Sequence, residues 1–138
     1  SVSKELYLKK NTDKGEKRER ISSNNPLRLG DLVTVQLIIS AKEDMEFVHL
    51  KDMRASCFEP VNVLSEHQYK GGLGFYQSTK DAATHFFFDS INKGTYVLEY
   101  DIRVNNLGDF SNGISTIESM YAPEFTSHTK GIRVNVKK

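Results

Sequence analysis

The sequence predicts a single all-β domain, built as an antiparallel sandwich with little or no helix. Apolar residues alternate with polar ones over several segments, which is the period of a half-buried strand. Turn-forming residues separate these segments at a spacing of roughly ten residues, and no long amphipathic segment of helical period lies between them. The chain has 138 residues, enough for one domain with its own hydrophobic core.

The clearest strand is predicted over residues 94–104. A helix would scatter the apolar residues of this segment around its circumference, whereas a strand aligns them on one face. The opposite face is polar except for Val97. The residues that share the apolar face are Tyr96, Leu98, Tyr100, Ile102 and Val104.

The same alternation predicts strands at residues 32–40 and 132–136. Residues 41–57 carry charges and methionines that a helix would tolerate, and we interpret positions 47–50 within them as strand. Shorter runs rich in β-branched and aromatic residues predict the remaining strands. These runs are 5–10, 46–50, 58–64, 75–79, 84–89 and 114–121.

Two polar stretches are predicted to be hairpin turns. Residues 11–20 interleave basic and acidic side chains, which is typical of a solvated hairpin tip, with a basic contact patch as the alternative. Residues 71–74, Gly-Gly-Leu-Gly, resemble a phosphate loop in composition. They lack the following Lys-Ser/Thr pair and the long helix that such a loop requires, so a hairpin turn is favoured.

Tyr96 opens the strongest strand directly after a turn. Immunoglobulin-like sandwiches often place a tyrosine there, and its hydroxyl bonds back to the preceding corner. The cysteine that follows two positions later in antibody domains is replaced here by Leu98. We therefore expect an immunoglobulin-like sandwich without the central disulfide, with an ordinary inward tyrosine as the alternative.

The sequence contains no recognisable catalytic or metal-binding motif. None of His49, His67, His85 and His128 shares a short ligand spacing with another histidine or with Cys57. Cys57 lacks the flanking cation or helix start that would activate a thiol, and we expect a small buried hydrophobe. We predict no cofactor, no metal and no enzymatic activity. The net charge of +1 gives no argument for nucleic acid or a membrane.

Two apolar runs could lie in the core or contact a partner. In residues 85–89, Phe86 and Phe88 would point one way and Phe87 the other, and we favour a region covered on both sides. Residues 120–125 end a strand with apolar residues beside a proline. They form either a packed strand exit or a contact ledge for another domain.

Four ordered motifs resemble the last domain of bacterial alpha-2-macroglobulin-like proteins. They are residues 52–60, 94–100, 108–110 and 118–124. The resemblance runs from about Pro26 to the C-terminus. The family pattern has Pro and Gly where this chain has Ala55 and Cys57, which affects only the local turn.

The resemblance implies a macroglobulin-type domain, residues 1–138, at the C-terminus of a longer multidomain chain. Such chains are exported, often lipid-anchored in the periplasm, and trap a protease that cuts their bait segment. In many of them a Cys-x-Glu-Gln thioester in an upstream domain takes part, and the last domain shields it. On this basis Met120, Tyr121 and Pro123 are the candidate contact residues. The partners would be upstream domains of the chain and, through the full-length protein, proteases.

Two other functions remain open from the residues alone. One is a stand-alone secreted adhesion or carbohydrate-binding module, which would bind a glycan through an exposed aromatic row. The other is a small hydrolase with a site assembled by the fold, although the Gly-x-Ser-x-Gly motif is absent from the sequence.

Overall fold

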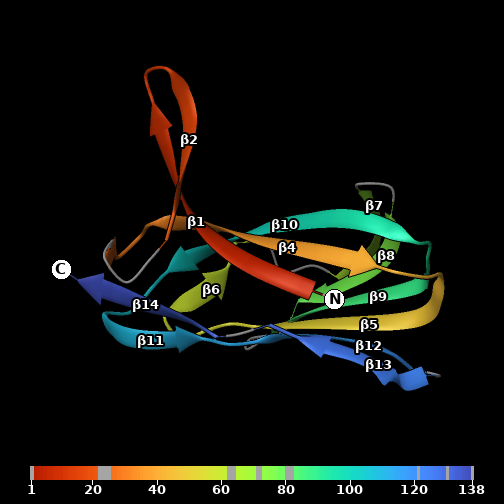
Figure 1. Ribbon diagram of the computed structural model, residues 1–138. Coiled ribbons are helices and arrows are strands. Elements are labelled where there is room, and N and C mark those ends of the chain that lie inside the picture. The colour runs from red at the N-terminus through yellow and green to blue at the C-terminus, as the bar shows by residue number, and fades with distance from the viewer. Residues whose placement is uncertain are drawn as a thin grey trace.

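The computed structural model describes residues 2–21, 26–61, 65–70, 73–79, 83–120, 122–129 and 131–137. Every regular element in these segments is a β-strand, as the alternation predicts. None of the described residues belongs to a helix of the length and hydropathy needed to cross a membrane. The strands form two facing layers (Figure 1).

The first layer is a five-stranded antiparallel sheet. Its inner face is set by the alternation in β4, where Val33, Val35, Leu37 and Ile39 are all fully buried. In spatial order its strands are β2 (Gly15–Arg20), β1 (Val2–Thr12), β4 (Leu32–Ala41), β10 (Gly94–Val104) and β6 (Phe58–Pro60).

The second layer is a six-stranded antiparallel sheet. Val48 and Leu50 of β5 and Phe86 and Phe88 of β9 form the buried part of its inner face. In spatial order its strands are β13 (Ala122–His128), β12 (Ser115–Ser119), β5 (Met45–Met53), β9 (Ala83–Ile91), β8 (Leu73–Thr79) and β7 (Ser65–Lys70).

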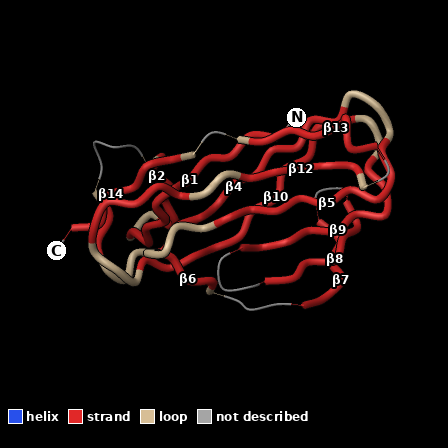
Figure 2. Tube along the Cα trace, turned by 90° about the horizontal axis from the view of Figure 1, so that it is seen from below, coloured by secondary structure: helices blue, strands red, loops and turns tan. Residues whose placement is uncertain are grey.

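A three-stranded sheet covers one end of the core. Its strands are β11 (Gly108–Asn112), β14 (Ile132–Lys137) and β3 (Leu27–Arg28), and β14 pairs with β3 in parallel. Leu27, Val134 and Val136 join the same hydrophobic cluster as the two large sheets. Figure 2 shows the long strands running along the molecule between loops at its two ends.

The corner at Tyr96 has the predicted form. The Tyr96 hydroxyl donates to the carbonyl of Asn92 at 2.8 Å, across the turn that leads into β10. Gly94 in this turn has a φ of 153°, which L side chains rarely adopt, and the Tyr96 ring lies over it. The tyrosine thus fixes the entry of the strand, as in immunoglobulin-like sandwiches.

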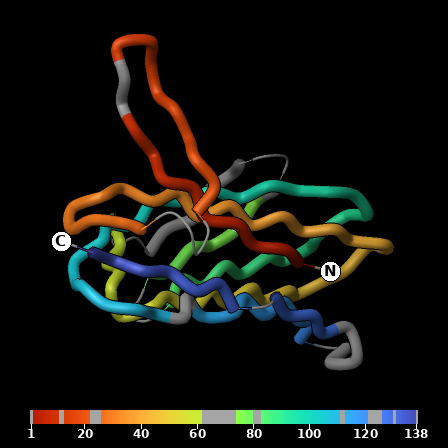
Figure 3. The backbone as a smooth tube through the Cα atoms, turned by 60° about the vertical axis from the view of Figure 1, so that its left-hand side comes forward, coloured from red at the N-terminus to blue at the C-terminus, as the bar shows by residue number. Residues whose placement is uncertain are grey.

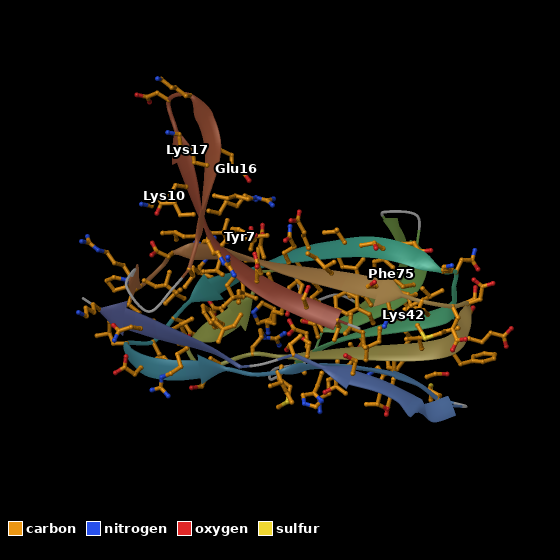
Figure 4. The ribbon with its side chains drawn as sticks, viewed as in Figure 1. Tyr7, Lys10, Glu16, Lys17, Lys42 and Phe75 are labelled. Carbon is orange, nitrogen blue, oxygen red and sulfur yellow. The ribbon has the colours of Figure 1, made fainter. Side chains whose placement is uncertain are left out.

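The far halves of β1 and β2 project from the sandwich as a hairpin arm (Figure 3). All residues of β2 are exposed, so the prediction of a solvated hairpin tip is confirmed. Arg18 pairs with Glu99 of β10 at 2.8 Å and anchors the base of the arm. Lys10, Glu16 and Lys17 lie along its length (Figure 4).

Candidate functional site

An apolar ledge lies at the end of the sandwich where β5 begins and β12 ends. It consists of Met120 and Phe47, whose side chains are 61% and 42% exposed. The Met120 amide donates to the carbonyl of Phe47 at 2.9 Å, so the two residues are held as neighbours. Two large exposed apolar residues with paired backbones are more typical of a contact surface than of scattered surface residues.

Phe47 has an unusual backbone conformation. Its φ is 53°, and it is the one described non-glycine residue with a positive φ. A bulky residue in this region is strained by roughly 1–3 kcal/mol, and such strain is concentrated at functional sites. Sequence reasoning placed Phe47 in a strand but missed its role in the ledge, because a positive φ at phenylalanine leaves no signal in the sequence.

A groove of about 500 Å³ lies at the same end of the sandwich, and neither ledge residue lines it. Ser119 and Val48, the chain neighbours of Met120 and Phe47, contribute to its wall. The rest of the wall comes from the end of β4, the charged turn residues Lys42 and Glu43, the start of β5, and β12 and β13, so the groove opens between the two layers. Ile39, Met45 and Ile117 give it an apolar floor.

The structure describes the three predicted contact residues, Met120, Tyr121 and Pro123, to different extents. Met120 is exposed on the ledge, between β12 and β13. Tyr121 lies outside the described residues. Pro123 belongs to β13, an edge strand of the six-stranded sheet, and only its backbone is described. The prediction that residues 120–125 end a strand is too simple, because a new strand starts at Ala122.

The outer face of the six-stranded sheet carries a group of three rings. The prediction that residues 85–89 are covered on both sides is wrong for this face, because Phe87 is 39% exposed while Phe86 and Phe88 are buried. The Phe87 ring stacks on His49, with centroids 4.7 Å apart and planes at 5°. His49 Nε2 lies 2.9 Å from His85 Nδ1.

The two histidines form a hydrogen-bonded pair rather than a metal chelate. Their ring planes differ by 7°, and their centroids lie 5.2 Å apart. The distance between the ring centroids is longer than the 2.9 Å between the two nitrogens by about two ring radii. The two nitrogens therefore lie between the rings and face each other. Burial lowers the pKa of His49, and Glu118 partly opposes the shift. Within the described segments, no three potential ligand side chains group to hold a metal ion.

A polar cluster lies inside the core. Lys4 of β1 and Asp52 of β5 form an ion pair at 2.5 Å between the two layers, with both side chains fully buried. Ser115 and Tyr100 donate to the carboxylate of Asp52. Burial lowers the pKa of Lys4, and the interactions with Asp52 oppose this. Sequence reasoning missed the cluster, although a lysine within the apolar row Val2, Leu6 and Leu8 was a signal for it.

Cys57 is enclosed in the core. The thiol of Cys57 is fully buried, and its surroundings raise its pKa to about 11. This confirms the interpretation of a small buried hydrophobe. The Gly71-Gly72 turn lies outside the described residues, and the strands on either side, β7 and β8, pair as a hairpin.

The comparisons with known proteins agree with the fold. A model of the bacterial alpha-2-macroglobulin MG10 domain matches residues 1–124. The chain belongs to this family. The match begins at the N-terminus and so includes β1 and β2, which the sequence resemblance, starting near Pro26, left out. A search of curated protein sequences finds no match.

Solved structures of alpha-2-macroglobulins contain a similar domain. The Escherichia coli protein, spanning domain MG7 to the C-terminus, superimposes with a TM-score of 0.78 at 18% identity over 100% of this MG10 chain and 23% of that chain. Salmonella alpha-2-macroglobulin reacted with methylamine superimposes with a TM-score of 0.72 at 21% identity, over 99% of this chain and 9% of that chain. The Actinomyces fimbrial adhesin FimA superimposes with a TM-score of 0.53 at 12% identity, over 96% of this chain and 56% of that chain. At these identities the similarity concerns the fold, and this chain spans only a small part of the macroglobulins.

Proposed function

We propose that this chain is the non-catalytic C-terminal domain of a bacterial protease-trapping protein and acts through contact with upstream domains of the same polypeptide. The neighbour in contact is a domain with a reactive thioester, which this domain shields from water. The parent protein is exported to the periplasm or cell envelope, with a lipid anchor as one form of attachment. Its protease partners bind the full-length protein rather than this domain.

The observation that supports this proposal is the ledge. Shielding a thioester requires an apolar surface that excludes water, and Met120 and Phe47 are exposed apolar residues at one end of the sandwich. Tyr121 and Pro123 continue the same segment in the sequence. A large apolar side chain gains about 1.5–3 kcal/mol on full burial, so a contact of this size can hold two domains in register.

The test replaces Met120 and Tyr121 by alanine in the full-length protein. If the ledge shields the thioester, its loss to water or methylamine becomes faster by about tenfold, which corresponds to about 1.4 kcal/mol of lost contact energy. The measurement is methylamine incorporation over time. Leu107→Ala is the matched control, because Leu107 is 44% exposed and follows β10 at the opposite end of the sandwich. Equal rates in the double variant and the wild type would refute the shielding role.

The exposed rings on β5 and β9 favour one second candidate, a glycan-binding module. Phe87 is exposed at the surface with His49 stacked on its ring, and an exposed aromatic side chain of this kind can contact a sugar ring. This function predicts saturable binding of a glycan by the isolated domain, lost in Phe87→Ala. Binding that survives this substitution would contradict the role of Phe87, and no binding at all leaves interdomain contact as the function.

A further inference from the structure

Lys4 occupies a position that is unfavourable for a lysine. Val2 and Leu6, on either side of it on the inner face of β1, are buried. Its cross-strand partner is Leu37 of β4, which in turn faces Leu98 of β10, and both leucines are buried. The ammonium group therefore reaches across the core to the opposite layer, where Asp52 is its charged partner.

We propose that Lys4 and Asp52 condense to an intramolecular amide, which joins β1 to β5 covalently across the core. Nζ of Lys4 lies 2.5 Å from Oδ1 of Asp52, and neither side chain is exposed at all. An ion pair in such a place is costly, since the attraction between two buried charges seldom repays their desolvation. An amide in the same place would carry no charge.

The contacts of the amine orient it for attack. Besides Asp52, Nζ donates to the carbonyls of Met53 at 3.1 Å and Gly113 at 3.2 Å. When one proton passes from Nζ to Oδ1, the two remaining N–H bonds stay on these carbonyls, and the freed lone pair faces the carboxyl group. Burial favours the neutral amine of Lys4, consistent with its lowered pKa.

The contacts of the carboxyl group stabilise the charge that the attack creates. Ser115 Oγ donates to Oδ1 at 2.6 Å, and the Tyr100 hydroxyl donates to Oδ2. As the Nζ lone pair adds to Cγ, negative charge grows on Oδ2, where Tyr100 already supplies a hydrogen bond. A donor at this oxygen acts as in an oxyanion hole, and here it comes from Tyr100 of β10, while Ser115 of β12 donates to the oxygen that leaves.

The step is balanced without a co-reactant. The bond from Nζ to Cγ forms, the bond from Cγ to Oδ1 breaks, and Oδ1 leaves as water with two of the three ammonium protons. The third proton stays on the amide nitrogen and donates to one of the two backbone carbonyls. Fixed neighbours react with effective molarities of about 10⁵–10⁸ M, which compensates for the poor leaving group.

The test is the mass of the purified protein after denaturation. We expect a mass lower than that of the sequence by one water. Trypsin should then release residues 1–9, uncleaved after Lys4, linked to residues 52–54. Lys4→Arg keeps the charge but cannot form the amide, so it should show the full mass. Asp52→Asn should form the same link with loss of ammonia.

A second variant keeps both reacting groups. Tyr100→Phe removes the donor to Oδ2, and the mass loss in newly synthesised protein should become about a hundredfold slower, as for the loss of an oxyanion-hole donor. Circular dichroism checks that each variant is folded. A wild-type protein with the full mass and two separate tryptic peptides would show that the pair is ionic only and would overturn the proposal.

Discussion

At the scale of single residues, burial in the core changes the protonation of Cys57. Cys57 is fully buried, and burial raises the pKa of its thiol to about 11 because the thiolate would lose its hydration. The folded state thus favours the neutral thiol. Between the ordinary thiol pKa and 11 the unfolded chain releases the proton first, so stability falls as the pH rises through this window.

We expect Cys57 to resist alkylation in the native protein at pH values near 8. The reagent attacks the thiolate, which is both rare and inaccessible in the fold. Labelling with iodoacetamide should therefore proceed only through unfolding, at least about a hundredfold slower than in the denatured chain. Mass spectrometry of samples quenched over time, with urea-unfolded protein as the control, checks this. Equal rates in both would mean that the thiol is not enclosed.

At the scale of elements, the alternation of apolar and polar residues predicted the longest strands. It could not predict which strand faces other parts of the molecule cover. It located β4 and β10 to within a residue, because an inner row of apolar residues leaves a period that only a strand can satisfy. The strands β2, β3, β7, β11 and β13 were missed as independent elements, and β2 lay inside the stretch predicted as a hairpin tip. They are short or carry few apolar residues, and their pairing depends on neighbours distant in sequence.

The strand β9 shows the same limit within one element and supports a direct test. Phe86 points into the core and Phe87 outward, and no sequence pattern in a run of three phenylalanines reveals which face is covered. Phe86→Ala should lower the free energy of unfolding by about 3–5 kcal/mol, the usual cost of a buried phenylalanine. Phe87→Ala should cost less than about 1.5 kcal/mol, the upper range of its aromatic contact with His49. Urea titrations of both variants measure the difference, and similar losses would contradict the observed orientation of the strand.

At the scale of the whole molecule, the features with functional meaning lie at different places on one rigid sandwich. The core holds the Lys4–Asp52 pair, the outer sheet face holds the ring group, and one end holds the ledge. The sequence resemblance pointed to the ledge through Met120 alone. Phe47 could not be predicted, because the ledge is completed by a backbone conformation and by a hydrogen bond between residues far apart in the sequence.

Two methionines at opposite ends of β5, Met120 beside its start and Met53 at its end, allow the proposed contact to be tested in the intact protein. Met120 lies at the ledge and is 61% exposed, whereas Met53 lies at the far end of β5 and is 38% exposed. Exposed methionines oxidise readily to the sulfoxide. In the isolated domain Met120 should therefore react with peroxide faster than Met53. In the full-length protein the order should reverse, because a neighbouring domain covers the ledge and leaves Met53 accessible. Peptide mass spectrometry gives both rates from one sample, and a Met120 that oxidises equally fast in both proteins would mean that no domain rests on the ledge.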